Sequence, residues 1–577
     1  MPSHYNCSGP QHFISIDTDI TGYRVIANYV ATAGIAVLLI IIYFFVGYEP
    51  ALDPFRKTDQ DTLNQSFRPN PIDEIILRTV RYIPKRLMGA RKVHINARVE
   101  KAFIKCILEM SDIQIITGLS ILISGYVQLH QGISSFHWIV IVDLAWFSSL
   151  THLACLTLLR NYLYNHSLQR TWRLVSMAVL VIFLTIALSF TGDYYWTSFK
   201  ILPDTTYFVR NDMIDPAMCH LSFSPSSMMA YCGMIISILL IILGFVTRII
   251  KLYKTISIDG WGKARARISM QARHLLSFAF TWCCSSGSRN SLKRTLLYRP
   301  LLTTFLVARL FLDGWSSMFL EVCWLIAGFF WGTIRLFGVL LIIQTPVYQD
   351  DGSLGPLIQD SDERDSDWGF GQVVALVLLF APLITVIKYF FTYDDKQSTG
   401  VVMSCSDHTI YGTSYLRSQS TSLTASPFEH QTSRRPDDPN SKWDDHSQTL
   451  GGAILYFILV CIAILILICI TNDTANLLDN LILYCPPAVI GLIGVWEVVL
   501  FSLAIELDLS DMPLWFQRLL QMVNILFFIL SAFFSDLKPT PHVHFPFAWI
   551  GTYSFLLSGV AFYVLWAVLY RILGSTS

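Results

Sequence analysis

Ionisable side chains inside apolar segments are the residues of this chain best placed to do chemistry. The sequence places seven of them in or beside long apolar runs: Asp143, His152, Arg309, Asp313, Glu321, Arg335 and Glu497. A charged group in lipid is costly unless it is paired or reaches water, so each is a candidate for binding a solute, an ion or a proton. Glu497, near the middle of its run, is the strongest candidate for a protonation-linked role.

Asp143 and His152 lie nine residues apart in one apolar run. On a helix this spacing puts them about 180° apart, so they cannot form a dyad with each other. Asp143 must therefore find a partner on another helix or be protonated. His152 shares its face with Ser148, Ser149 and Cys155, which also fits a hydrogen-bonded packing residue.

The segment from 309 to 335 carries charged and small residues at steps of three, four and seven. On one helix they form a single face, made of Arg309, Asp313, Ser317, Glu321, Gly328, Gly332 and Arg335. Two interpretations remain open. The face either fixes packing between helices through an ion-pair network, or it lines a path for a substrate or ion.

Two further runs carry uncharged polar stripes at helical spacing. The first stripe is Gln114, Thr117, Ser120, Ser124 and Gln128; the second includes Gln517, Gln521 and Asn524. Each stripe is either a wall of a polar cavity or an ordinary contact surface between helices, since Gln, Asn, Ser and Thr also hydrogen-bond across helix interfaces.

The elements that position these residues are membrane-spanning helices. The 577 residues are 53% hydrophobic and 14% charged, with mean hydropathy +0.50, and apolar runs of about 20 residues recur along the chain. The pattern predicts an all-α, polytopic helical membrane protein with about eleven transmembrane helices. The expected spans are 25–47, 112–129, 137–160, 174–191, 229–250, 315–343, 369–391, 450–470, 482–503, 514–534 and 546–570, with 298–312 as a tilted or interfacial lead-in.

Charge in the connecting segments predicts the orientation. The predicted loops 48–110 and 251–300 are basic, which places them in the cytosol, the N-terminus on the lumenal or extracellular side and the C-terminus in the cytosol. The expected organisation is a lumenal tail 1–24, helices one to seven over 25–391, a disordered linker 392–449 and helices eight to eleven over 450–573. Glycosylation sequons at Asn6 and Asn472 fall on the lumenal side.

Cysteine spacing and charge exclude several functions. The twelve cysteines contain no C-x-x-C pair, so no metal site and no disulfide framework is expected, although Cys7, Cys219, Cys232 and Cys485 leave one or two lumenal bridges open. No cofactor is predicted. The formal net charge is zero, and the distribution of charge from loop to loop argues against nucleic-acid binding as the main function. No nucleotide-binding or metalloprotease motif is present.

The stretches SDIQIITGLSILISGY and IVDLAWFSSLTHLACLTLLRNYL resemble, over about residues 105–190, an uncharacterised group of multi-pass membrane proteins of filamentous ascomycete fungi. The resemblance implies a fungal origin and a membrane location, and it transfers no catalytic residue.

The predicted function is transporter-like or channel-like handling of a small solute, in the plasma membrane or an endomembrane. The alternatives are an integral membrane enzyme acting on a lipid or isoprenoid, and a membrane scaffold. The expected partners are the lipid bilayer and a small-molecule or lipid substrate. The oligomeric state is left open.

Overall fold

The computed structural model describes residues 17–55, 69–88, 97–191, 216–220, 228–284, 298–344 and a few short stretches up to residue 387. These residues are overwhelmingly helical. The elements in order are α1 (Thr18–Thr21), α2 (Tyr23–Ile42), the π-helical η1 (Tyr43–Gly47), α3 (Pro71–Met88), α4 (Ala97–Leu129), α5 (Ser135–Leu158), α6 (Arg160–Asn165), α7 (Ser167–Phe190), the 3-10 helix η5 (Ala217–His220), α8 (Met228–Leu252), the π-helical η6 (Thr255–Gly262), α9 (Lys263–Cys284), α10 (Arg299–Ser316), α11 (Met318–Gln344), and a two-stranded antiparallel hairpin of β1 (Val347–Tyr348) and β2 (Leu354–Gly355).

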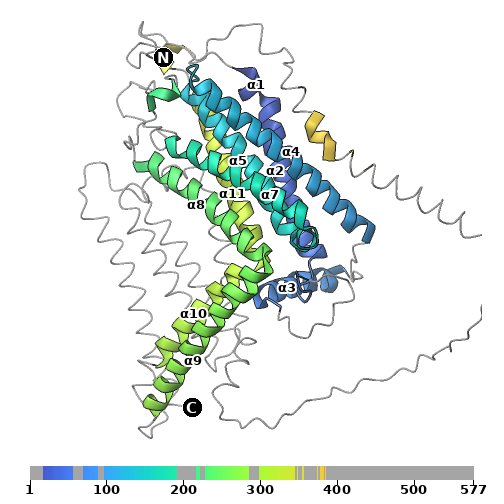
Figure 1. The fold of residues 1–577 in the computed structure, drawn as a ribbon, viewed down its shortest axis with the longest axis vertical. Helices are drawn as coiled ribbons and strands as arrows, with labels where there is room; N and C mark the ends of the chain where they lie inside the picture. Colours follow the sequence, from blue (N-terminus) through green and yellow to red (C-terminus); the bar gives the residue numbers. More distant parts are fainter. Residues whose placement is uncertain are drawn as a thin grey trace, which may run out of the picture.

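Helix α5 is the centre of the bundle. All of its residues are buried, and α2, α4, α7, α8 and α11 surround it (Figure 1). A helix that is apolar on every side is expected in the interior of a bundle, where no face meets solvent or lipid. The two ionisable candidates on α5, Asp143 and His152, are therefore both held inside protein.

Six of the described helices are long and apolar enough to cross a membrane. They are Asp19–Gly47, Ala102–Leu129, Ser135–Leu158, Ser167–Phe190, Gly233–Leu252 and Met318–Leu340. The chain is thus a multi-pass membrane protein, and these helices coincide with the first six predicted spans. The second and fourth begin earlier than predicted, because the helical conformation continues past the apolar run into more polar residues.

The predicted turn between the second and third spans is present. Gly132, in the left-handed region at φ 88°, reverses the chain after α4, a conformation that glycine adopts without strain. Ser134 then caps α5 by accepting a hydrogen bond from the backbone N–H of His137. The α4–α5 hairpin follows from these local residues.

The prediction that the charged and small residues from 309 to 335 form a single face of one helix is wrong. The chain is interrupted at Ser317, whose backbone is extended, so α10 and α11 are two helices. Arg309 and Asp313 lie on α10, whereas Glu321 and Arg335 lie on α11. The four charges therefore do not share a face, although their spacing in the sequence runs without a break across Ser317. Helix α10, the predicted lead-in, is not among the six candidate spans.

Three helices lie at the end of the bundle where α2, α5 and α8 end and α11 begins. Helix α3 runs across that end, and α9 and α10 leave it together, crosswise to the bundle helices (Figure 1). Helix α3 lies within the first predicted basic loop, 48–110, and its Ile72, Ile76 and Leu77 are buried. Most of predicted span 369–391, the linker 392–449 and the spans within 450–573 lie outside the described residues.

Candidate functional site

An ion pair joins α5 to α11 in the interior of the bundle. Arg335 Nη2 lies 3.2 Å from Asp143 Oδ1, and both residues are buried. Arg335 Nη1 also donates to Ser237 Oγ of α8 at 2.7 Å, and Trp331 Nε1 donates to the same oxygen at 2.9 Å. The prediction that Asp143 needs a partner from another helix is confirmed. We call Asp143 and Arg335 the interior pair.

The Asp143 carboxylate is incompletely satisfied. Both of its oxygens are buried, and neither accepts a hydrogen bond of good geometry from any residue that the structure describes. The guanidinium group is near enough to neutralise the charge, yet it does not fill the acceptor positions. A carboxylate can accept about four hydrogen bonds, so this group retains capacity for a further donor or cation.

Close helix packing places the interior pair. Glycines on α11 let the helix approach α5 so that Trp146 and Leu150 lie directly against its backbone, with Trp146 Nε1 donating to the Gly328 carbonyl at 3.0 Å. A Cβ added at Gly332 would lie 2.5 Å from Trp146. Gly328 and Gly332, four residues apart on α11, therefore form a close contact with α5.

His152 points to a different neighbour. Its Nδ1 lies 2.7 Å from Ser111 Oγ of α4, while its Nε2 is buried without a partner among the described residues. As predicted from their spacing, Asp143 and His152 do not form a dyad, because one faces α11 and the other faces α4. The contact with Ser111 supports the interpretation of His152 as a hydrogen-bonded packing residue.

The first polar stripe is mainly a packing and surface feature. Gln114 is buried, and its backbone carbonyl accepts a hydrogen bond from Ser148 Oγ of α5, beside the close approach at Gly118. Thr117 and Ser120 bond to carbonyls of their own helix, and Gln128 donates to Ser124. Ser120 and Ser124 are exposed. Among the described residues, none of these hydrogen bonds reaches Asp143 or Arg335.

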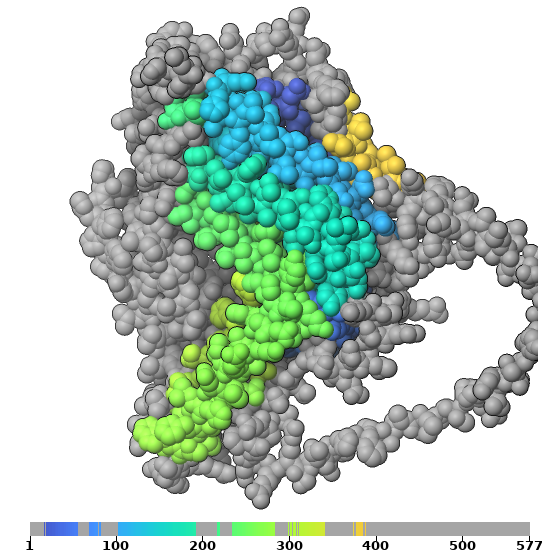
Figure 2. Space-filling model, in the orientation of Figure 1, coloured from blue at the N-terminus to red at the C-terminus, as the bar shows by residue number. Residues whose placement is uncertain are grey.

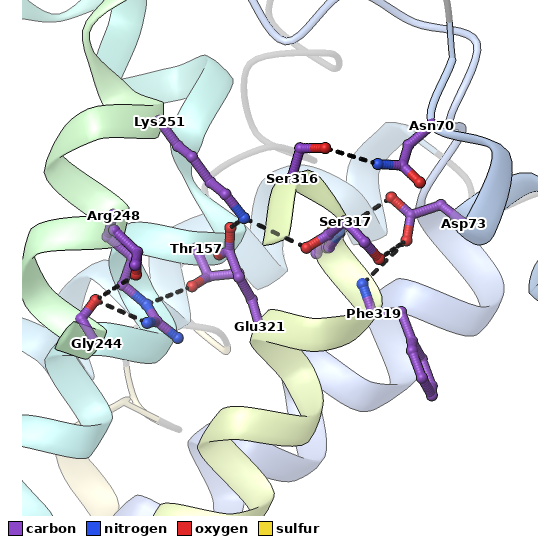
Figure 3. Close-up of polar contacts among 12 residues, drawn as sticks. Asn70, Asp73, Thr157, Gly244, Arg248, Lys251, Ser316, Ser317, Phe319 and Glu321 are labelled. Carbon is purple, nitrogen blue, oxygen red and sulfur yellow. Dashed lines mark hydrogen bonds and ion pairs between the residues drawn. The ribbon is translucent and has the colours of Figure 1, made fainter. Parts of the chain in front are cut away.

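A second set of buried charges lies where α11 begins; we call it the end network (Figure 3). Lys251 of α8 pairs with Glu321 at 2.5 Å and also donates to the Ser317 carbonyl. Asp73 of α3 accepts hydrogen bonds from Ser317 Oγ at 2.6 Å and from the backbone N–H groups of Met318 and Phe319, each at 3.0 Å. The network thus fastens α3, α8 and α11 together.

Two arginines extend the end network. Arg248 donates to the Leu153 carbonyl at 3.2 Å, to Thr157 Oγ1 at 2.8 Å and to the Gly244 carbonyl at 2.8 Å. Arg160 of α6 stacks on the Phe55 ring. Burial lowers the pKa of Arg160, while Glu321 opposes that shift. Burial likewise raises the pKa of Asp73, which its three hydrogen-bond donors and Lys251 oppose.

Sequence reasoning missed Asp73, Arg160, Arg248 and Lys251 as partners of Glu321 or of α11. For Arg248 a signal existed, because a cation near the end of an apolar run is expected to find a partner. Asp73 and Arg160 fall in polar segments, where a charge is normally solvated. Nothing local distinguishes them from surface residues.

Arg309 and Asp313 form the predicted i, i+4 pair on α10, with 3.8 Å between Arg309 Nε and Asp313 Oδ2. Arg265 of α9 also pairs with Asp313. The Arg265–Asp313 pair therefore links α9 to α10, and these charges lie apart from the interior pair. Glu497, Gln517, Gln521, Asn524, Asn6 and Asn472 lie outside the described residues.

No protein-family model matches the chain, and neither a curated protein nor a solved structure is significantly similar to it.

Proposed function

We propose that this multi-pass membrane protein handles a small solute in a transporter-like or channel-like manner, with the interior pair as its contact point. The observation that carries the proposal is the buried Asp143 carboxylate, whose oxygens accept no hydrogen bond among the described residues. Buried polar groups in proteins are normally hydrogen-bonded, and an exception indicates a role beyond packing. A cation, or a hydrogen-bond donor of a solute, would fill the unused acceptor positions of the Asp143 carboxylate.

The position of the pair supports this assignment. Arg335 lies fourteen residues after Glu321 on α11, which is about 21 Å along the helix axis. The interior pair is therefore well inside the membrane-spanning part, whereas the end network lies at one end. Among the described residues of α5, α8 and α11, apolar packing separates the interior pair from the end network. Such a separation is expected for a solute site that lies away from the membrane surface.

Transport by the full chain in liposomes tests the proposal. A panel of cations, amino acids and polar metabolites is screened for uptake, and the Asp143→Asn variant is compared on every solute that the wild-type protein transports. We expect a loss of at least about tenfold, since a hydrogen bond to a charged group is worth about 1.5–3 kcal/mol.

Asp112→Asn is the matched control. It makes the same chemical change on α4, in a carboxylate that Arg173 already binds through two hydrogen bonds of 3.0 and 2.6 Å. We expect it to transport like the wild-type protein. Uptake by Asp143→Asn that equals the wild-type rate for every transported solute would remove the interior pair from the function.

We also propose eleven spans, a lumenal or extracellular N-terminus and a cytosolic C-terminus. Two observations support this orientation. Basic residues gather at the end of the bundle that carries α3 and α9, in agreement with the positive-inside rule. Cys219, at the opposite end beside the α4–α5 turn, forms a disulfide, which belongs in an oxidising compartment.

The relationship to the fungal membrane proteins is proposed on the same stretches that suggested it. An enzyme acting on a lipid or isoprenoid and a scaffold remain alternative proposals. In the enzyme alternative, Asp143 or Glu497 would act as the proton donor. Because Arg335 faces Asp143 directly, the structure favours a binding role for this carboxylate.

A further inference from the structure

Helix α9 exposes a strip of large apolar side chains. The exposed fractions are 64% for Ile268, 61% for Leu275, 69% for Phe278 and 52% for Trp282. At 100° per residue these four positions fall within about 80° of the helix surface, so they form one continuous strip. Contiguous exposed apolar surface of this kind marks a contact with a partner or a membrane.

The strip is not the packing face of α9. Leu276 and Ala279 are buried, and at 100° per residue they lie about 80° and 20° from Ile268, on the side of the helix away from Phe278. Arg265, beside them, pairs with Asp313 of α10. Helix α9 is therefore packed through one face, and the exposed apolar strip lies beside that face.

The charge of α9 indicates the kind of partner. Its 22 residues contain Lys263, Arg265, Arg267 and Arg273 and no Asp or Glu. Arg267 is exposed, and its position borders the apolar strip. An apolar strip bordered by cations is the pattern of a helix that lies in the interface of an anionic membrane.

The position of α9 matches that interface. The membrane-spanning α8 ends at Leu252 and continues through η6 into α9 without a long connection. Helices α9 and α10 then run crosswise to the spanning helices (Figure 1), and α9 is uncovered over most of its length on the face shown in Figure 2. The segment η6 also exposes Ile256, Ile258 and Trp261, which suits the headgroup region.

We propose that α9 lies in the headgroup region of the leaflet at this end of the bundle. The strip formed by Ile268, Leu275, Phe278 and Trp282 enters the acyl region, and Arg267 contacts anionic headgroups. The partner is an anionic bilayer surface. The proposal rests only on the membrane-spanning character of α8 and is independent of solute handling at the interior pair.

Photo-crosslinking in nanodiscs tests this proposal with the full chain. A benzophenone amino acid replaces Phe278 in one variant and Ala279, which is buried and lies about 100° around the helix from Phe278, in a matched control. The discs contain phosphatidylcholine alone or with phosphatidylserine, and intact-mass spectrometry counts lipid adducts. We expect adducts at position 278, severalfold more than at 279, and a higher yield with phosphatidylserine.

Arg267→Glu in the same labelled chain tests the electrostatic part. We expect it to remove the gain that phosphatidylserine gives, because it replaces attraction by repulsion. A yield of lipid adducts at position 278 that does not exceed the yield at 279 overturns the proposal. Crosslinking of position 278 to protein overturns it as well, since a protein surface then covers the strip.

Discussion

Asp143 and Arg335 are residues whose charges depend on each other. Each is buried, and the nearest opposite charge to the carboxylate is the guanidinium group at 3.2 Å. Removing one partner leaves the other charged in a medium of low dielectric, whereas removing both leaves an apolar contact. Buried pairs commonly behave in this asymmetric way.

A double-mutant cycle measures this dependence. We expect Arg335→Met to lower the free energy of unfolding by about 3–5 kcal/mol, and the double variant Asp143→Leu/Arg335→Met to lower it by much less. Unfolding in detergent, followed by circular dichroism, provides the comparison. A double variant as unstable as Arg335→Met alone would show that the lost stability comes from packing and not from the unpaired carboxylate.

For single residues, the sequence predicted that Asp143 needs a partner but did not predict which residue the partner is. Asp143 stands out because it interrupts an apolar run. Arg335 lies far from Asp143 in the sequence, and only the packing of α11 on α5 shows that it faces this carboxylate. Asp73 was not predicted, because its role depends on where α11 begins in space.

The contact between α5 and α11 is the element-scale feature most sensitive to volume. We expect Gly332→Ala to destabilise the protein by about 1–3 kcal/mol, since the added methyl group meets Trp146 at 2.5 Å. Gly338→Ala is the control on the same helix, because no described atom lies within 4 Å of its Cβ position. We expect this control to be neutral or slightly stabilising.

Thermal unfolding of the two variants in the same detergent gives the comparison. Equal midpoints for Gly332→Ala and Gly338→Ala would contradict the close approach of α11 to α5.

The start of α11 depends on a residue of α3. Asp73 accepts hydrogen bonds from the first two backbone N–H groups of α11 and from Ser317. We expect Asp73→Ala to lower the free energy of unfolding by about 1–3 kcal/mol, because it leaves buried donors without an acceptor. The exposed neighbour Glu74, changed to Ala, serves as the control and should change stability by less than about 0.5 kcal/mol.

Hydrogen exchange at the start of α11 gives a second measurement. It should speed up in Asp73→Ala and stay unchanged in Glu74→Ala. Unaltered protection in Asp73→Ala would mean that another group holds this helix end.

The six described spans were predictable, since hydropathy and length are local properties of the chain. The break at Ser317 was not. Charged and apolar residues keep helical spacing through it, and the extended Ser317 is stabilised by Asp73, a residue far away in the sequence. Local periodicity carries no information about such a contact.

The described part of the molecule has two ends of different chemistry. Arginines and lysines gather at the end with α3 and α9, and the disulfide-bonded Cys219 lies at the other. The predicted topology places both sequons, at Asn6 and Asn472, on the side of Cys219.

Glycosidase treatment of the chain expressed in a eukaryotic host tests this topology. We expect a mobility shift that Asn6→Gln and Asn472→Gln each reduce. Modification at Asn6 without modification at Asn472 would indicate that the number of spans between the two sequons differs from the predicted number by an odd number. The orientation predicted for the C-terminal half would then be inverted.

The complete enclosure of α5 has a consequence for how the protein is made. Helix α5 leaves the ribosome before α8 and α11, so Asp143 enters the membrane long before Arg335 is synthesised. When α5 enters the membrane, three of the five helices that surround it, α7, α8 and α11, have not yet been made. Biogenesis must therefore shelter an unpaired acid, either inside the insertion machinery or beside a membrane chaperone, until the later helices arrive.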